Sequence, residues 1–518
     1  MIQIDRHKWM VCLTVLLGAI MSAVDTSIVN VALPYMRGNL GASVEEITWV
    51  ASGYILSSVI VMPVIAFLSA RFGRRPFYLF SVFLFTASSM LCGLAWDLPS
   101  LIIFRVIQGI GGGVLLPISQ AILRETFSEK EQGLAMGIYG MAVVIGPAFG
   151  PALGGWLTDN FSWPWIFYIN IPIGIVNFWM ATKYIQEPSF LVREKGKIDW
   201  LGLILMTMSF VAMQIVFEKG QDKGWFDSSL IVWSTVIAVG SMALFIWREL
   251  SIDKPVVDLS LFKDTNFVCG TLVGAVFGLC LYSTLFLQPL FLQQLGYSAN
   301  QTGMILIPRS LIMAIAMPLA GRLYNSWGPR NILLIGLGIT VCSYWQFAHL
   351  SLDVNGQDLI VPQLLQGMGF GMMFVALSTV VLSTVDKPKM TAAVGLYNVV
   401  RQIMGSVGIA IAASLLSNGE TLYRSVLISH VTPYNPMSRQ WIANVAQGFQ
   451  HHGMNALSAH TAAIVSLSNE VDRQAQMLYF NHIFILMAVI FILSIPLMMT
   501  IKNKRPQGKA GGLEDAVH

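Results

Sequence analysis

Charged side chains are scarce in this sequence. They account for 11% of the 518 residues, whereas hydrophobic residues account for 55%. A soluble domain carries charges on about a quarter of its residues, so this composition excludes a water-soluble fold. The net charge of +4 reflects how basic residues are divided between the two faces of a membrane, and it gives no reason to expect a nucleic-acid partner.

Motifs for nucleotide or metal chemistry are absent as well. The sequence has no GxxxxGK[ST] loop for ATP phosphates and no HExxH pair, and the run 109–113 does not satisfy GxGxxG. Its five cysteines lie in apolar segments without CxxC spacing, which argues against a disulfide framework or a metal site. We therefore expect no enzymatic activity, no cofactor and no metal. Energy must come from a gradient, in which one charge crossing 100 mV releases about 2.3 kcal/mol.

Long apolar segments recur along the chain with short polar breaks between them. Each is long enough to cross a hydrocarbon core, which takes about 20 helical residues. Their continuous apolarity fits helices and not the alternating strands of a barrel. We count fourteen such segments: 9–34, 47–70, 77–95, 100–123, 132–158, 165–182, 199–217, 229–247, 266–292, 301–320, 331–350, 359–382, 391–416 and 483–500.

The basic residues indicate the orientation. An even number of crossings places both termini on one side, and most of the 31 lysines and arginines fall on that side. Because basic loops stay in the cytoplasm, we expect both termini of this multi-pass membrane protein to be cytoplasmic.

A faint internal repeat divides the chain. The motif at 66–75 returns at 321–330, and the glycine-rich run 108–113 returns at 366–371. The repeat predicts two six-helix bundles that rock about a site near the bilayer midplane, with two helices inserted between them. The expected divisions are an N-terminal bundle at 1–185, inserted helices and linker at 186–250, a C-terminal bundle at 251–505 and a tail at 506–518.

One external segment, 418–477, is too long to be a simple turn. Its parts 438–450 and 458–478 have a mixed apolar and polar spacing that suggests surface helices. The sequence favours a lid over the outer mouth, with a docking surface for a periplasmic partner as the alternative.

Asp25 lies in the middle of the first segment, where an ionised carboxylate costs about 3 kcal/mol even on a lenient insertion scale. Burial favours the protonated form of a carboxyl group. Whether the group then holds a proton depends on which side of the membrane it is open to. We favour a proton carrier. The alternative is a structural aspartate that bonds a neighbouring helix through Thr26 or Ser27.

Arg105 lies in the fourth segment, on one helical face with Gln108 and Gly112. Because arginine stays charged, its expected role is electrostatic: it stabilises a nearby carboxylate and changes that group's protonation when the distance changes. The alternative is a packing arginine that binds backbone carbonyls.

Two further arginines lie within apolar segments. Arg309 follows Pro308 near the outer end, where its side chain could reach the interface, and the sequence gives it no clear role. Arg401 stands beside Asn398 and resembles a cavity residue.

The fifth segment combines close helix packing with bends. Gly146, Gly150 and Gly154 recur every four residues, and two prolines remove backbone hydrogen bonds. We expect a hinge or pivot helix. Its characteristic residues are Gly146, Pro147, Gly150, Pro151, Gly154 and Gly155.

At four motifs the chain resembles the major facilitator superfamily, and within it the fourteen-span drug:proton antiporters of the EmrB/QacA type. The likeness covers nearly the whole chain, and the fifth-helix and sixth-helix motifs are quite specific. The motifs lie at 24–34, at Arg105, Gln108 and Gly109, at 146–155 and at 165–174.

The loop between the second and third segments departs from the superfamily pattern. Arg71, Gly73 and Arg74 are kept, but Ala66 and Ala70 replace its usual glycine and aspartate. Without the aspartate, the charge relay that holds this loop in relatives is absent, and we expect the outward-facing state to be held in another way.

The resemblance implies an all-α major facilitator fold. It also implies an inner-membrane exporter of amphipathic, often cationic or uncoupler-like compounds in exchange for protons, with an EmrA-type periplasmic adaptor and a TolC-type outer-membrane channel as partners. Candidate cavity residues on its cavity helices are Asn30, Gln108, Tyr139, Tyr282, Gln288, Asn398 and Arg401.

Two alternatives remain open from the sequence. A proton symporter that imports a metabolite would use the same fold, and only the 146–155 helix argues against it. A non-transporting receptor or scaffold would need neither Asp25 nor Arg105.

Overall fold

The described part of the computed structural model is helical and contains no strand. Helices satisfy every backbone hydrogen bond within one segment, as a chain in lipid requires. The expected tail 506–518 lies outside the described residues, as do 189–198 of the expected linker. The structure describes residues 6–188, 199–221, 223–252, 257–352, 354–432 and 434–501.

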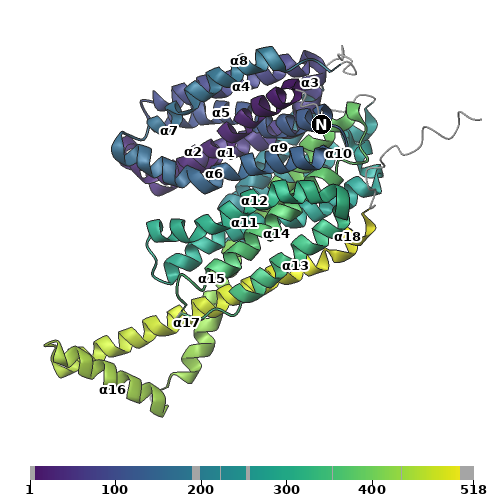
Figure 1. Ribbon diagram of the computed structural model, residues 1–518. Helices are drawn as coiled ribbons and strands as arrows, with labels where there is room; N and C mark the ends of the chain where they lie inside the picture. The colour runs from purple at the N-terminus through teal and green to yellow at the C-terminus, as the bar shows by residue number, and fades with distance from the viewer. Residues whose placement is uncertain are drawn as a thin grey trace, which may run out of the picture.

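The first group of helices forms a bundle around α1 and α5 (Figure 1). Helix α1 packs along α5, α6 and α8, and α4 packs along α5 and α8. Pro63 interrupts the second segment with a short 3₁₀ turn. The helices are α1 (Arg6–Leu40), α2 (Val44–Val61), η1 (Met62–Val64), α3 (Ile65–Phe72), α4 (Arg74–Gly93), α5 (Leu98–Thr126), α6 (Gln132–Asn160), α7 (Trp165–Tyr168) and α8 (Asn170–Tyr184).

The second group repeats this arrangement in the later part of the chain. Helix α14 packs along α12 and α13, and α11 packs along α15. The helices are η3 (Leu259–Lys263), α11 (Thr265–Gln294), α12 (Ala299–Trp327), α13 (Pro329–Phe347), α14 (Ile360–Val380), η4 (Lys387–Lys389), α15 (Met390–His430), α16 (Pro436–His451), α17 (Ala456–Leu493) and α18 (Ile495–Thr500).

Two inserted helices, α9 (Trp200–Lys219) and α10 (Ser229–Ser251), pack against each other, with η2 (Trp225–Asp227) between them. Helix α9 also contacts α2 and α15, one helix from each bundle. The inserted pair is therefore joined to both halves of the molecule.

Thirteen helices in the described residues are long and apolar enough to cross a membrane. The remaining expected segment, 331–350, corresponds to α13, which begins with Pro329, Arg330 and Asn331 and is therefore less apolar. Helix α13 still packs along α14 and α17. The arrangement is consistent with fourteen segments.

The two bundles touch at the end that carries the 71–75 loop. A Cβ added to Gly133 of α6 would lie 2.5 Å from the carbonyl oxygen of Gly321 in α12, so the two backbones are in direct contact. Arg74 Nη2 donates a hydrogen bond to Thr391 Oγ1 of the other bundle at 2.7 Å. These contacts close the space between the bundles at this end.

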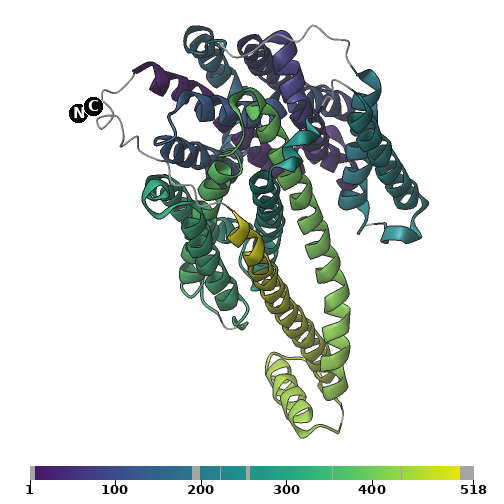
Figure 2. The same cartoon turned by 90° about the vertical axis from the view of Figure 1, so that its right-hand side faces the viewer.

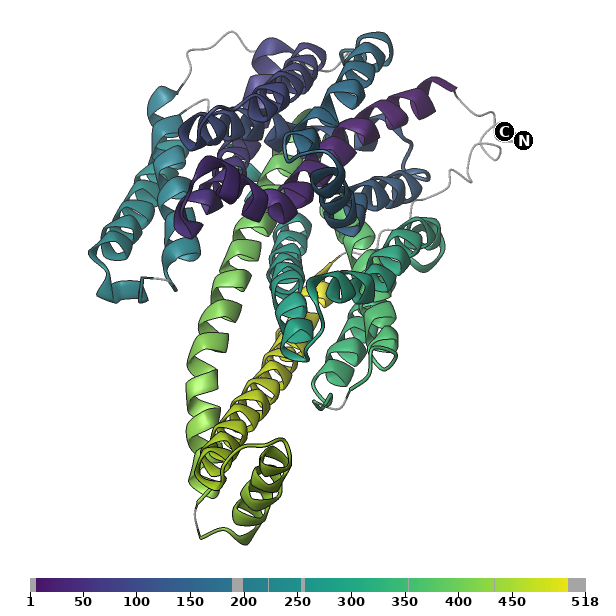
Figure 3. The ribbon, with the colours of Figure 1, turned by 90° about the vertical axis from the view of Figure 1, so that its left-hand side faces the viewer.

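The segment 418–477 forms a helical arm. Helices α15 and α17 have 41 and 38 residues, and at 1.5 Å per residue each is about 60 Å long, twice the hydrocarbon core. Their outer parts and α16 project away from the bundles (Figures 1, 2 and 3). An ion pair between Arg424 and Asp472 joins α15 to α17. The expected surface helices are present, but the lid interpretation is wrong because the arm points away from the bundles.

Candidate functional site

Asp25 and Arg105 form a buried ion pair inside the N-terminal bundle. Arg105 Nη1 lies 2.6 Å from Asp25 Oδ2, and the two side chains are 1% and 0% exposed. The structure thus places the two charges next to each other. A charge pair out of water is stable only where its remaining hydrogen-bonding groups are also satisfied.

Two amides complete the coordination of the carboxylate. Gln108 Nε2 donates to Asp25 Oδ1 at 2.9 Å, and Asn170 Nδ2 donates to the same oxygen at 3.1 Å. Arg105 is held in turn by the Val50 carbonyl at 3.0 Å and by Gln108 Oε1 at 2.7 Å. Helices α1, α5 and α8 thus meet at one carboxylate, and α2 holds the arginine that pairs with it.

Asn170 was not singled out from the sequence, although it lies within the recognised sixth-helix motif. It is the first residue of α8, after the short helix α7, and it also donates to Ser89 of α4 at 3.1 Å. The signal available in the sequence was the presence of a polar residue between two apolar helical stretches.

Tyr54 of α2 covers the other side of the ion pair. Its ring centroid lies 4.4 Å from Arg105 Cζ, close enough for a cation–π interaction. Its hydroxyl lies 3.1 Å from Ser22 Oγ, which also donates to the Gly112 carbonyl at 3.1 Å. Any Cβ at Gly112 would collide with the Tyr54 hydroxyl, so position 112 must be glycine for the ring to lie here.

The glycines of α6 pack against the part of α1 that carries Asp25. A Cβ at Gly146 would collide with the Ala23 backbone, and one at Gly150 would collide with Ser27. Ser27 Oγ donates to the Gly146 carbonyl at 2.7 Å. The backbones of α6 and of the helix that carries the buried carboxylate are therefore in direct contact.

The other residues of the 146–155 motif differ in how tightly they are packed. Gly154 packs tightly against Ile28, whereas a Cβ at Gly155 would meet only Val31 at 3.9 Å, an ordinary contact. Helix α6 continues through the exposed Pro151. The side chain of Pro147 lies outside the described residues.

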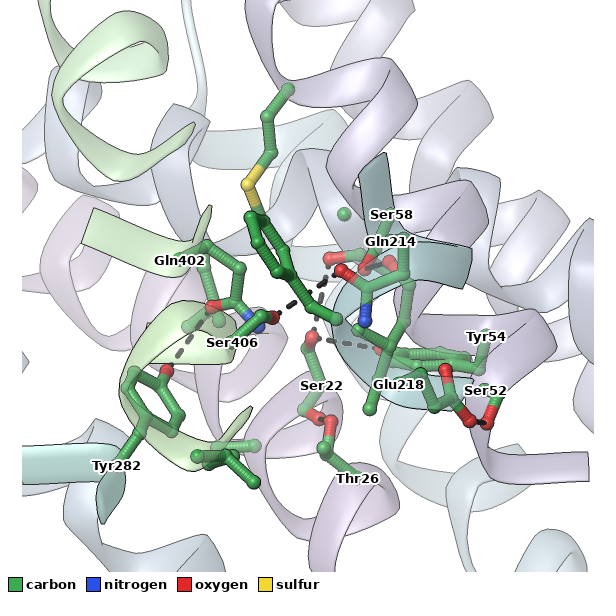
Figure 4. Close-up of a pocket in the computed structure, with 18 of the residues that line it drawn as sticks. Ser22, Thr26, Ser52, Tyr54, Ser58, Gln214, Glu218, Tyr282, Gln402 and Ser406 are labelled. Atoms are coloured by element: carbon green, nitrogen blue, oxygen red, sulfur yellow. Dashed lines mark hydrogen bonds between the residues drawn. The ribbon is translucent and has the colours of Figure 1, made fainter. Parts of the chain in front are cut away.

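A cavity of about 350 Å³ lies between the bundles, next to Tyr54 (Figure 4). Both bundles and the inserted helix α9 contribute to its wall. Its polar lining consists of Ser22, Thr26, Ser52, Tyr54, Ser58, Gln214, Glu218, Tyr282, Gln402 and Ser406.

Only one of the expected cavity residues, Tyr282, lines this space, where its hydroxyl donates to Gln402 Oε1 at 3.1 Å. Gln108 lies on Asp25 instead, and Asn30 is exposed on α1. Glu218 was not predicted from the sequence. It stands between the apolar run 199–217 and Lys219, a position typical of a residue at the membrane surface.

Three other expected cavity residues lie in the contact between the bundles. The Tyr139 ring stacks on Phe374 at 6.5 Å between centroids. Asn398 Nδ2 donates to Gln120 Oε1 of α5 at 3.0 Å, and Arg401 Nη2 donates to Asn398 Oδ1 at 2.8 Å. Tyr139 and Asn398 thus contact the other half, Arg401 holds Asn398, and none of the three lines the described cavity.

Arg309 is buried in the C-terminal bundle, so the expectation that it reaches the interface is wrong. It donates to Gln288, whose Nε2 donates to Gln366 Oε1 at 2.7 Å. Gln366 is the repeat counterpart of Gln108, and Gln363 stands where the N-terminal copy has Arg105. The second bundle therefore has an amide cluster where the first has a carboxylate.

The loop 71–75 is held by Arg74. Its guanidinium pairs with Glu125 of α5 and reaches Thr391 of α15, and Glu187 accepts from the backbone nitrogens of Arg74 and Arg75 at 2.7 and 3.2 Å. Gly73 has a φ of +94°, which favours glycine. Arg71 lies in the last turn of α3. Arg74 thus anchors this loop to α5 and α15, although the aspartate of the superfamily motif is missing.

Two helical bundles, a cavity between them and a buried ion pair beside that cavity define the architecture of a polytopic membrane transporter. The Major Facilitator Superfamily profile matches residues 15–409. The chain is 35% identical to the multidrug export protein EmrB of Haemophilus influenzae over 481 residues, 92% of each chain. It is 33% identical to the fatty acid resistance protein FarB of Neisseria gonorrhoeae over 507 residues, 97% of each chain. The chain belongs to the major facilitator superfamily and, within it, to the family of the EmrB multidrug export proteins.

A solved structure agrees with this fold. The human organic anion transporter MFSD10 superposes with a TM-score of 0.59 at 16% identity, over 95% of this chain and 99% of that one. At this identity the likeness concerns the fold alone, and it confirms the all-α major facilitator architecture expected from the sequence.

Proposed function

We propose that this protein is a proton-coupled antiporter that exports amphipathic, toxic compounds across the bacterial inner membrane, with both termini in the cytoplasm. The observation that carries the proposal is the position of the Asp25–Arg105 pair. One side chain, Tyr54, contacts Arg105 with its ring and lines the cavity. A proton site and a substrate site are thus close enough to influence each other.

The coupling follows from the electrostatics of the pair. While Asp25 is ionised, Arg105, Gln108 and Asn170 hold it in place. A proton that binds from the outer side neutralises the carboxylate and weakens its attraction to Arg105. Helix α1 is then free to shift along the glycines of α6, the cavity opens to the other side, and the proton leaves toward the cytoplasm. Substrate occupies the cavity in the opposite half of the cycle.

Two observations favour export over import: the packing of α6 and the names of the similar proteins. The glycine motif at 146–155 abuts the Asp25 segment, and the similar proteins carry the names multidrug export protein and fatty acid resistance protein. A scaffold is disfavoured because a buried charge pair is costly to a protein that does not use it.

The arm supports a tripartite assembly with an EmrA-type adaptor and a TolC-type channel. It extends about 30 Å beyond a hydrocarbon core of about 30 Å. Large apolar side chains are exposed along it, as is typical of a surface that contacts another protein. They include Leu422, Val426, Tyr434, Met437 and Leu457.

Inverted membrane vesicles provide the test. With an imposed pH gradient reported by a dye, addition of an amphipathic drug should dissipate the gradient, and Asp25→Asn should abolish the response. A proton-coupled importer would move the drug in the same direction as the protons, whereas an antiporter moves the two in opposite directions. A protein that gives no drug-dependent proton flux would contradict the antiporter proposal.

A further inference from the structure

The inserted helix α9 forms part of the cavity wall between the bundles. Gln214 and Glu218, one helical turn apart, both line the cavity (Figure 4). Ser52 of α2 donates to the Glu218 carboxylate, and Ser406 of α15 donates to Gln214 Oε1 at 3.3 Å. One face of α9 therefore contacts both bundles at the place where substrate is expected to bind.

Glu218 is the only charged side chain among the described residues that line this cavity. Lys219 follows it in sequence but is not among the described lining residues of this cavity; it lines a small recess of about 10 Å³ together with Trp49 and Leu56. No lysine, arginine or histidine is found among the described lining residues. Among the described lining residues, the one formal charge is thus a carboxylate.

From this arrangement we propose that Glu218 is the cation-recognition residue of the cavity, and that the inserted helix pair supplies it. The ligand class is an organic monocation with an apolar body. The proposal rests on the export function above and assigns its substrate class and a residue that selects it.

The rest of the lining fits such a ligand. Tyr54, Phe217 and Tyr282 offer aromatic side chains, which attract cations through their ring faces. The remaining apolar wall accommodates a hydrophobic body without a fixed hydrogen-bonding pattern. It includes Ala23, Ile55, Met62, Leu116, Val143 and Ile409. Because the cavity is partly shielded from water, a charge–charge attraction in it is stronger than at the surface.

The two carboxylates are placed for different tasks. Asp25 is fully buried and already bonded to Arg105, Gln108 and Asn170. Glu218 is half-buried and accepts a hydrogen bond from the neutral hydroxyl of Ser52. A cationic substrate therefore meets Glu218 and not the proton site.

Two probes of nearly the same shape and opposite charge test the proposal: tetraphenylphosphonium and tetraphenylborate, bound to the purified full-length protein in detergent. We expect the native protein to bind the phosphonium at least about tenfold more tightly than the borate. Glu218→Gln, which keeps the size of the side chain, should remove most of that preference. Glu218→Asp should retain it, and so should Glu470→Gln, which removes an exposed carboxylate from the arm.

An unchanged preference in Glu218→Gln, or no preference in the native protein, would overturn the assignment. A second measurement separates loss of cation recognition from loss of export: proton-linked export of an uncharged drug by the Glu218→Gln variant in vesicles. If that export persists while the phosphonium preference is lost, both proposals hold. If drug-dependent proton flux is missing from the native protein, the export function fails whatever the binding preference.

Discussion

The ring of Tyr54 lies over the guanidinium of Arg105, with 4.4 Å between the ring centroid and Cζ. The same side chain reaches Ser22 with its hydroxyl and lines the cavity. It is the direct contact between the buried ion pair and the space proposed for substrate.

Substitutions at Tyr54 separate its ring from its hydroxyl. Tyr54→Phe keeps the cation–π contact, and we expect proton-coupled export close to that of the native protein. Tyr54→Leu loses that contact, worth about 2 kcal/mol in a desolvated site, and should uncouple drug binding from proton flux. The measurement is the number of protons moved per drug in inverted vesicles. Equal coupling in both variants would show that the ring does not connect the two sites.

Removing one member of the ion pair should destabilise the fold as well as abolish coupling. Asp25→Asn leaves Arg105 buried without its counter-charge, a change that costs about 3–5 kcal/mol. Thermal unfolding of the purified protein in detergent measures it. The double variant Asp25→Asn, Arg105→Gln should recover much of the lost stability, because no isolated charge remains, but it should recover no proton-coupled export. A double variant less stable than Asp25→Asn would contradict this explanation.

Two glycines of α6 provide a matched comparison. Gly146→Ala places a methyl group against the Ala23 backbone of α1, and overpacking of this kind costs about 1–3 kcal/mol. We expect a lower unfolding temperature and strongly reduced transport. Gly155→Ala, whose methyl group would lie 3.9 Å from Val31 Cγ1, should behave like the native protein. Similar losses in both variants would indicate a general effect of helix composition and not the α1–α6 contact.

Shortening the arm should separate transport from assembly. Replacement of α16 and its flanking loops by a short turn between α15 and α17 removes exposed apolar surface but no residue of the described cavity or the ion pair. Drug-dependent proton flux in vesicles should stay within about twofold of the native value, since loops are tolerant of such changes. Co-purification with an EmrA-type adaptor and drug resistance of whole cells should be lost. Unchanged adaptor capture would place the docking surface elsewhere.

Much of the fold could be predicted from the sequence. Long apolar segments have one solution in lipid, and the energetic cost of a charge within such a segment made Asp25 and Arg105 conspicuous. The glycine spacing of 146–155 likewise predicted close packing, which the contacts of Gly146 and Gly150 with α1 now explain.

Other parts of the site were decided by tertiary structure alone. Gln108 was expected in the cavity but lies on the carboxylate, and Asn170 was not assigned a role although it binds the same oxygen. Asn398 binds Gln120 of the other bundle and Arg401 binds Asn398, away from the described cavity lining. Glu218 was overlooked because it stands at the end of an apolar run. The spacing of residues along a helix fixes which side chains share a face, but which neighbour that face meets depends on contacts between segments far apart in the chain. That is why the sequence determined the helices and the buried charges, and only the packing of α9 between the bundles placed a carboxylate in the cavity.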